Sequence, residues 1–296
     1  MVDREILNGI VDIHVHPGPS VSRRALDIAE MLKEAEAAGY KAFMAKDHYM
    51  PTMMPAELAE KHLGHHKTKV LSGLVLNNSM DAFNLEMVET AVLMGAKTIW
   101  MPTLSARQGR GDANAHFPGS EYLSIPDAPI YYLKENGELH DDVVQLLRFM
   151  ALHPEVPLAT GHGSVPEINA LLEQAFALGV QKIIVNHPFL ITRASYGDVR
   201  RWAEMGAYIE LTASVFEGVL GLDMYPLSLI RDYMNFVPED RLVICSDCGA
   251  WSKRGYFSPV ESLYIFINLL IEELGLSVAQ IESMGKTTPA RLMGLS

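Results

Sequence analysis

The feature that most constrains the fold of this sequence is the alternation of short β-branched apolar runs with amphipathic helical stretches along almost its whole length. Such alternation is typical of parallel strands joined by helices. Eight strands are predicted, at residues 10–15, 41–46, 69–76, 97–102, 157–161, 181–186, 207–212 and 241–246. Eight parallel strands favour an α/β architecture closed into a (β/α)8 TIM barrel, with residues 1–296 forming one domain.

The stretches between the strands carry apolar residues at helical spacing, as Ala25, Ile28, Leu32 and Ala35 show. Helices are predicted at residues 22–38, 84–95, 141–152, 166–178, 196–205, 226–235 and 259–274. The pattern is unclear between the second and third strands. Glycines that suit helix C-caps follow five of these helices, at Gly39, Gly95, Gly179, Gly206 and Gly275.

A long insertion separates the fourth strand from the fifth, at residues 103–140. Its second half, "IYYLKENGELH", predicts a hairpin that turns at Asn136 and Gly137. Loops after barrel strands lie on the face where TIM barrels carry out chemistry. The insertion is therefore either a lid over an active site or a surface excursion.

The charge balance limits the classes of partner. The formal net charge is −12, which argues against nucleic-acid or anionic-membrane surfaces because both require clustered Lys and Arg. No apolar run reaches the roughly 18 residues of a membrane span, and the charged start "MVDREILNG" lacks the apolar core of a signal peptide. We therefore expect a cytoplasmic protein that acts on a small molecule.

Two further features concern thiols and assembly. Cys245 and Cys248 are the only cysteines, and a single C-x-x-C pair is read most simply as two free thiols. The apolar stretch "SLYIFINLLIEEL" could pack against a second copy in a homo-oligomer or could serve as an outer helix of the barrel.

Polar residues that can bind metal recur at the carboxyl ends of the predicted strands. They are His14 and His16 after the first, Lys46, Asp47 and His48 after the second, His162 after the fifth, His187 after the sixth and Asp247 after the eighth. Strand side chains alternate in direction, so His14 and His16 share one side while Val15 points away. Imidazole and carboxylate suit zinc, manganese or iron, and we expect a divalent ion, most simply zinc, on the barrel axis.

The ordered set of motifs resembles the amidohydrolase superfamily of metal-dependent barrel hydrolases. The matching features are "VDIHVHPG", a histidine after strands five and six, an aspartate after strand eight, and the ending "TTPARLMGLS". Carried over residue by residue, the resemblance implies that His14, His16, His162, His187 and Asp247 surround one or two metal ions. It implies catalytic roles for Asp247 and His187.

One departure from that pattern concerns the metal count. Two-metal members of the superfamily usually bridge the ions with a carboxylated lysine or a glutamate after strand four, but here Met101, Pro102 and Thr103 end that strand. Lys46 could be carboxylated and bridge from strand two, could orient an anionic substrate, or could pair with an acid. The missing bridge favours one ion and a catalytic His187.

A second resemblance competes with the first. "AKDHY" and "SDCG" are similar to motifs of the polymerase-and-histidinol-phosphatase (PHP) phosphoesterases, which would make His48 a metal ligand. The glutamate that this family requires after strand three is missing, and Gly249 stands where its final histidine should be.

The mechanism expected from the ligand set is hydrolysis. A divalent ion lowers the pKa of a water and polarises the scissile bond, while Asp247 accepts the proton and returns it to the leaving group. Candidate substrate-binding residues are Lys46, His48, Arg107, Arg110 and Trp251. We expect an amide, cyclic amide, lactone or ester of a small anionic molecule as substrate. A metal-dependent decarboxylase and a PHP-like phosphoesterase are the alternatives.

Overall fold

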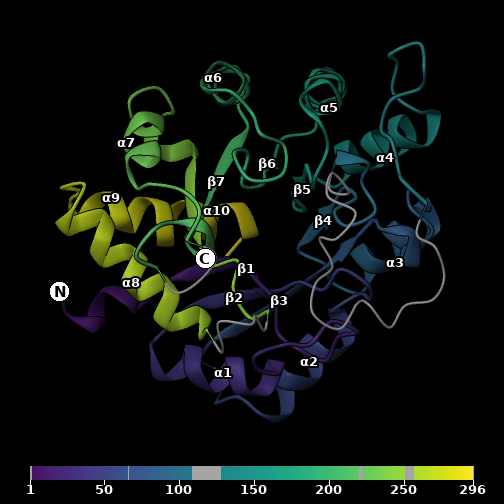
Figure 1. Ribbon diagram of the computed structural model, residues 1–296. Coiled ribbons are helices and arrows are strands. Elements are labelled where there is room, and N and C mark those ends of the chain that lie inside the picture. The colour runs from purple at the N-terminus through teal and green to yellow at the C-terminus, as the bar shows by residue number, and fades with distance from the viewer. Residues whose placement is uncertain (1, 66, 109–127, 220–222, 251–256, 296) are drawn as a thin grey trace.

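The structure, a computed structural model, describes residues 2–65, 67–108, 128–219, 223–250 and 257–295 (Figure 1). Eight parallel strands form one sheet in chain order, and helices surround it. The strands are β1 Val11–Val15, β2 Ala42–Ala45, β3 Lys69–Val75, β4 Thr98–Trp100, β5 Leu158–Ala159, β6 Ile183–Val185, β7 Tyr208–Thr212 and β8 Leu242–Cys245. Each lies within its predicted range, so the predicted TIM barrel is confirmed.

Most of the predicted helices are also present. They are α1 Ile28–Ala37, α3 Leu85–Leu93, α4 Asp141–Leu152, α5 Val165–Leu178, α6 Tyr196–Glu204, α7 Ser228–Met234 and α8 Pro259–Glu272. The chain ends with α9 Val278–Glu282, a π-helical turn at Ser283–Thr287, and α10 Thr288–Met293. The five glycines predicted to cap helices all have positive φ, between +73° and +109°.

One boundary of the predicted helices was wrong, and one helix was not predicted. The first helix begins at Ile28 rather than at residue 22, because Asp27 and Glu30 form a reciprocal capping box that fixes its first turn. Residues before Asp27 instead make isolated β-bridges, including one between Arg24 and Ala250. In addition, a helix that the sequence pattern left unclear, α2 Met53–His62, follows β2.

The buried side chains divide into two clusters on the two faces of the sheet. The larger cluster packs the outer faces of the strands against the helices and includes Val15, Phe43 and Ile99. The smaller cluster fills the barrel interior and includes Val11, Ile13, Met44 and Trp100. Because the interior is packed with apolar side chains, polar side chains that point inward can gather only at its carboxyl end.

The barrel closes where the segment after β8 meets the end of β1. Val15 forms a parallel bridge with Cys248, the Asp247 amide donates to the His14 carbonyl at 2.8 Å, and the His16 amide donates to the Cys248 carbonyl at 2.7 Å. Gly249 allows this approach. Its φ is +109°, and a Cβ on it would lie 2.4 Å from the carbonyl oxygen of His16.

The predicted hairpin in the insertion is confirmed. Leu133 and Leu139 form an antiparallel bridge, and the Lys134 amide donates to the Glu138 carbonyl at 2.7 Å across a turn that contains Gly137. Residues 109–127 of the insertion, where the sequence suggested a lid, lie outside the described residues.

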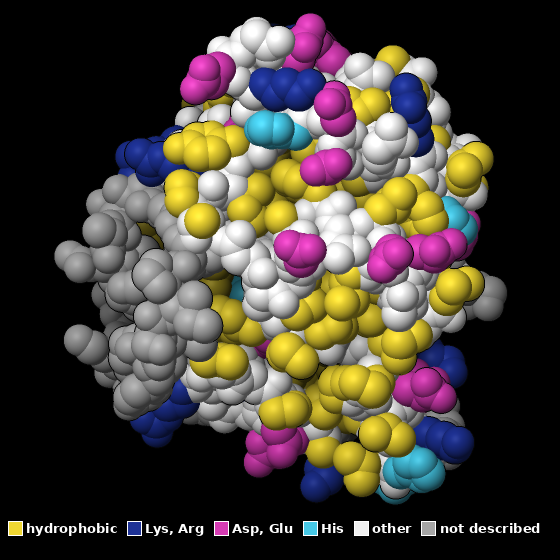
Figure 2. Space-filling view, turned by 90° about the vertical axis from the view of Figure 1, so that its right-hand side faces the viewer, with side chains coloured by type: hydrophobic (Ala, Val, Ile, Leu, Met, Phe, Trp, Pro, Cys, Tyr) yellow, Lys and Arg dark blue, Asp and Glu magenta, His cyan; other side chains and the backbone are white. Residues whose placement is uncertain are grey.

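The outer surface bears on the predicted assembly and membrane properties. Helix α8, which carries the apolar stretch considered above, buries nine of its residues within the chain and so serves as an outer helix of the barrel. Figure 2 shows apolar side chains interspersed with charged ones over the side of the molecule that carries α3 and α4; exposed Leu93 and Leu152 belong to these helices. None of the helices in the described part of the chain combines the length and apolar character that crossing a bilayer requires.

Substitution of Gly249 tests the closure of the barrel. We expect Gly249→Ala to lower the free energy of unfolding by more than about 3 kcal/mol, because the new methyl group must displace the backbone of His16. Gly137→Ala is the matched control: its φ is +84°, but a Cβ there meets nothing within 4 Å. We expect the control to lose only about 1 kcal/mol. Urea denaturation of both variants gives the comparison, and equal losses would contradict the proposed clash.

Candidate metal centre

A bulge in β1 turns two histidines toward the barrel axis. Asp12 pairs with Phe43 and Val15 pairs with Ala45, so β1 carries one more residue than β2 between these two pairs. Ile13 faces the interior and Val15 faces the helices, although simple alternation would place both on the same side. The extra residue lets His14 face inward as well. Val15 then points away while His14 and His16 lie with ring centroids 5.0 Å apart, as the sequence predicts.

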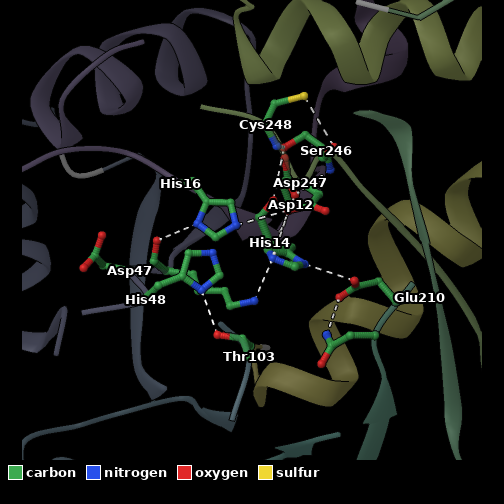
Figure 3. Close-up of polar contacts among 12 residues, drawn as sticks. Asp12, His14, His16, Asp47, His48, Thr103, Glu210, Ser246, Asp247 and Cys248 are labelled. Atoms are coloured by element: carbon green, nitrogen blue, oxygen red, sulfur yellow. Dashed lines mark hydrogen bonds and ion pairs between the residues drawn. The ribbon is translucent and has the colours of Figure 1, made fainter. Parts of the chain in front are cut away.

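Asp12 holds this bulge against β8. Its Oδ1 accepts hydrogen bonds from the amide of His14 at 3.2 Å and from the amide of Ser246 at 3.1 Å. The side chain is fully buried, and burial raises the pKa of its carboxyl to about 7. Asp12 thus positions the backbone of the first histidine (Figure 3).

Five imidazoles gather at the carboxyl end of the barrel. Ring centroids lie 5.9 Å apart for His14 and His187, 4.7 Å for His16 and His48, 5.1 Å for His162 and His187, and 6.4 Å for His48 and His162. All five are buried. Burial lowers the pKa of His14 and of His16 to about 3 and holds the pKa of the other three below the ordinary value. At neutral pH they are neutral imidazoles, which is the form that binds metal.

One compact group of potential ligands is formed by His14, His16 and Asp247, whose ligand atoms lie within 4.8 Å of one another. Asp247 Oδ1 is 3.1 Å from Nε2 of His14 and 3.1 Å from Nε2 of His16. Burial by itself would raise the pKa of the Asp247 carboxyl, but when the neighbouring imidazoles carry a proton, the charge of His14 and the hydrogen bond from His16 hold that pKa well below the usual range. Asp247 is therefore an anion, and it has a positive φ of 50°, a conformation that is common at functional sites.

The protonation state of His16 decides whether its contact with Asp247 is attractive or repulsive. Its Nδ1 lies 3.0 Å from the Lys46 carbonyl oxygen, which can only accept, so Nδ1 carries the proton. In a neutral ring Nε2 then presents a lone pair to the Asp247 carboxylate at 3.1 Å. Two acceptors that face each other at this distance repel unless a cation lies beside both.

Glu210 on β7 orients His14, and the sequence analysis missed it. Its Oε1 lies 3.0 Å from His14 Nδ1, and its Oε2 accepts a hydrogen bond from Asn186 Nδ2 at 3.0 Å. Burial raises the pKa of the Glu210 carboxyl to about 7. A carboxylate on the far nitrogen of a ligating histidine fixes its ring orientation. The available signal was a lone charged residue in the apolar strand "AYIELT".

Lys46 and His48 enter the cluster from the end of β2, as predicted. Lys46 Nζ lies 3.0 Å from His14 Nε2, and burial lowers the pKa of its ammonium group. His48 Nδ1 lies 2.9 Å from Thr103 Oγ1, and Asn77 Nδ2 donates both to this oxygen and to the His48 carbonyl, each at 2.9 Å. Thr103, which cannot bridge two ions, therefore positions an imidazole instead.

His162 and His187 belong to neither compact ligand group of the described residues. His187 has a φ of +20°, and within the described part of the chain its buried Nδ1 has no hydrogen-bond partner. A buried nitrogen without a partner is costly, so this atom is available to a ligand or a substrate.

A second compact group joins His14 and Glu210 with Cys245, and both cysteines are free and buried, as expected.

Other candidates stand apart from the cluster. Asp47 accepts a hydrogen bond from Arg24 at 2.8 Å and is directed away from the histidines (Figure 3). Arg107 is exposed and forms no hydrogen bond or ion pair with the cluster among the described residues. Arg110 and Trp251, two predicted substrate-binding residues, lie outside the described residues. The glycine at position 249 leaves no room for the histidine of the PHP motif, since any Cβ there would strike the carbonyl of His16.

The residues present fit a divalent metal ion. Neutral imidazoles and an ionised carboxylate provide nitrogen and oxygen donors, the donors of His14, His16 and Asp247 converge, and the lone pair of His16 faces an anion. His14, His16 and Asp247 would hold the ion.

Solved structures with the same fold are amidohydrolase-type barrels. An amidohydrolase from Pseudomonas aeruginosa has a TM-score of 0.63 at 10% identity, covering 98% of this chain and 97% of its own. A lactonase from Listeria monocytogenes has a TM-score of 0.61 at 14% identity, covering 100% and 97%. The phosphotriesterase homology protein from Escherichia coli, complexed with phosphate in its active site, has a TM-score of 0.61 at 16% identity, covering 97% and 99%. These similarities confirm the resemblance at the level of the fold.

Sequence comparison with curated proteins gives no significant match. Residues 9–210 match the sequence profile described as "Family of unknown function (DUF6282)". The matched segment begins just before β1 and ends at Glu210 in β7, so it contains the five clustered histidines and Lys46 but not Asp247. Because the match spans well over half of the chain, the chain belongs to the DUF6282 family.

Proposed function

We propose that this chain is a metal-dependent hydrolase that uses an activated water to cleave an amide, cyclic amide, lactone or ester bond in a small anionic substrate. The observation that carries the proposal is the pair of lone-pair donors on His16 and Asp247, which face each other at 3.1 Å in a buried site. A cation beside both atoms removes their repulsion. The lactonase and the amidohydrolase that share this fold support the choice of hydrolysis.

The donor set favours zinc over harder ions. Magnesium and calcium prefer oxygen ligands, whereas His14, His16, His162 and His187 offer nitrogen. When bound, a divalent ion in this site supplies Lewis acidity, which lowers the pKa of a water molecule and polarises the scissile bond. Manganese and iron are compatible with the same ligands, and one or two ions fit the proposal.

The chain's own residues would provide the proton transfers. Asp247 is ionised and its Oδ1 lies 3.1 Å from Nε2 of both His14 and His16, so it can accept a proton from the attacking water and return it to the leaving group. His187, whose Nδ1 has no hydrogen-bond partner among the described residues, would stabilise negative charge that develops on the substrate or ligate a second ion. Glu210 keeps the ring of His14 in position.

Two roles for Lys46 are compatible with its position at the end of β2, beside His14. As an amine, its Nζ lies 3.0 Å from Nε2 of His14, and once that nitrogen binds an ion the ammonium group would instead orient an anionic substrate. As a carboxylated lysine it would bridge two ions from β2 in place of the missing ligand after β4. His48, which stacks on His16, would then face the substrate beside it.

Metal content tests the ligand assignment. After zinc loading and dialysis, the wild-type chain should retain about one or two equivalents of zinc, and His16→Ala should lose most of it because one of the three convergent donors is gone. His62→Ala, which removes an exposed histidine of α2, is the matched control and should bind as the wild type does. Elemental analysis gives the stoichiometry. Equal zinc in His16→Ala and wild type would remove His16 from the site.

The melting temperature gives a second, independent test of metal binding at His16. A chelator should lower the melting temperature of the wild type and of His62→Ala but leave that of folded His16→Ala unchanged, because ligand binding stabilises only the state that binds.

Asp247→Asn tests the base. The amide keeps the shape of the carboxylate but cannot accept the proton, so we expect turnover to fall by about 100-fold or more. A panel of lactones, cyclic amides and esters provides the assay, with CO₂ release from unsaturated acids measured in parallel. Unchanged hydrolysis in the variant would exclude Asp247 as the base, and CO₂ release without hydrolysis by the wild type would favour the decarboxylase.

A further inference from the structure

The segment that precedes α1 brings Arg24 to the mouth of the barrel. Arg24 bridges Ala250 in the segment after β8, and the amide of Ala25 donates to the carbonyl of Gly249 at 2.7 Å. Gly249 itself lies against His16. Arg24 is therefore held beside the segment that carries Asp247 and reaches from there toward the end of β2.

The side chain of Arg24 is buried, but only one of its three guanidinium nitrogens has hydrogen-bond partners among the described residues. It is 3% exposed, and its Nη2 donates to Asp47 Oδ2 at 2.8 Å and to Ser20 Oγ at 3.2 Å. Nε and Nη1 are buried and have no hydrogen-bond partner among the described residues. Three of the five N–H donors of the guanidinium belong to these two atoms.

The partner of Arg24, by contrast, uses both of its oxygens. Asp47 Oδ1 accepts hydrogen bonds from the amides of Tyr49 at 2.9 Å and Met50 at 3.0 Å, while Oδ2 accepts from Arg24. The pair is therefore neutral overall but asymmetric, because both carboxylate oxygens have partners whereas two of the three guanidinium nitrogens have none among the described residues. Buried polar groups in proteins are nearly always paired, so unused guanidinium donors call for an additional acceptor.

The guanidinium also lies close to the metal-site side chains. Its positive charge contributes to the lowered pKa values of His16, Lys46 and His48, which lie at the ends of β1 and β2. Because Asp47, which Arg24 contacts, lies between Lys46 and His48 in the chain, a group bound to Arg24 would lie near the end of β2 at the mouth of the barrel.

We propose that the unused N–H groups of Arg24 bind a carboxylate of the substrate and so select carboxylate-bearing molecules for this site. The inference deepens the proposed hydrolase function and rests on it. Arg24 was not among the candidate substrate-binding residues, because the sequence pattern placed it inside a helix.

A carboxylate suits this position better than a phosphoryl group. Asp47 already neutralises one charge of the site, so a monoanion leaves a smaller charge imbalance than a phosphoryl group with −1.5 to −2 charges. Carboxylates also accept coplanar hydrogen bonds from guanidinium groups. A substrate held in this way could place its scissile bond toward His14 and Asp247.

The test follows the guanidinium directly. The Nε–H signal of Arg24 in ¹⁵N-labelled full-length protein is assigned by its loss in Arg24→Lys and is then followed by NMR during titration with benzoate. We expect a saturable shift of this signal at millimolar benzoate and about tenfold weaker benzoate binding to Arg24→Lys, since lysine keeps the charge but loses the planar donors. Arg148→Gln, an exposed position on α4, is the matched control and should bind benzoate as the wild type does.

Two results would overturn the proposal. One is an Arg24 signal that does not move with benzoate up to about 50 mM, a concentration at which even weak carboxylate binding registers. The other is a response to inorganic phosphate in the absence of a response to benzoate, which would assign the position to a phosphoryl group. Because the first observation needs only the wild-type chain, it holds even if Arg24→Lys does not fold.

The titration is run on both chelator-treated and zinc-loaded protein to separate this inference from the proposed function. If Arg24 responds to benzoate but the protein binds no zinc, the hydrolase proposal fails and the carboxylate site stands. If zinc binds and the Arg24 signal is silent toward benzoate, the carboxylate site fails alone.

Discussion

The contact between the lone pair of His16 and the anionic oxygen of Asp247 is the interaction on which the rest of the structure depends. These atoms lie 3.1 Å apart in a largely buried site, where the side chain of His16 is 4% and that of Asp247 14% exposed, and neither can donate to the other while His16 is neutral. The low dielectric of a buried site strengthens their repulsion and equally strengthens the attraction of both to a cation. The folded chain thus stores an unfavourable contact that a divalent ion converts into a favourable one.

Several local features keep these atoms together. The bulge in β1 turns His14 inward, Asp12 ties the backbone of β1 to β8, and Gly249 lets the segment after β8 lie directly on His16. Apolar packing below the site fills the rest of the barrel interior, so the polar side chains have no other place to gather. The fold therefore brings the donors together on rigid elements, which is the general condition for tight metal binding and efficient catalysis.

The spacing of apolar residues along the sequence is enough to predict the barrel. It also predicts that the histidines at the strand ends share one face, because a buried parallel strand is an apolar run whose carboxyl end opens onto the site. It does not predict the start of α1, where the capping box of Asp27 outweighs an apolar spacing that continues to Ala25. The wrongly extended helix contained Arg24, which was not among the candidate substrate-binding residues. Glu210 was missed for a different reason: its partner, His14, lies 196 residues away, and only closure of the barrel brings the two together.

The central claim is most directly tested by a crystal structure of the zinc-soaked protein with diffraction measured on both sides of the zinc absorption edge. The account predicts an anomalous peak about 2.0–2.2 Å from Nε2 of His14, Nε2 of His16 and a carboxylate oxygen of Asp247. A second peak beside Lys46 would show that this lysine bridges two ions. No peak among these three side chains, with His16 and Asp247 still facing each other, would contradict the account.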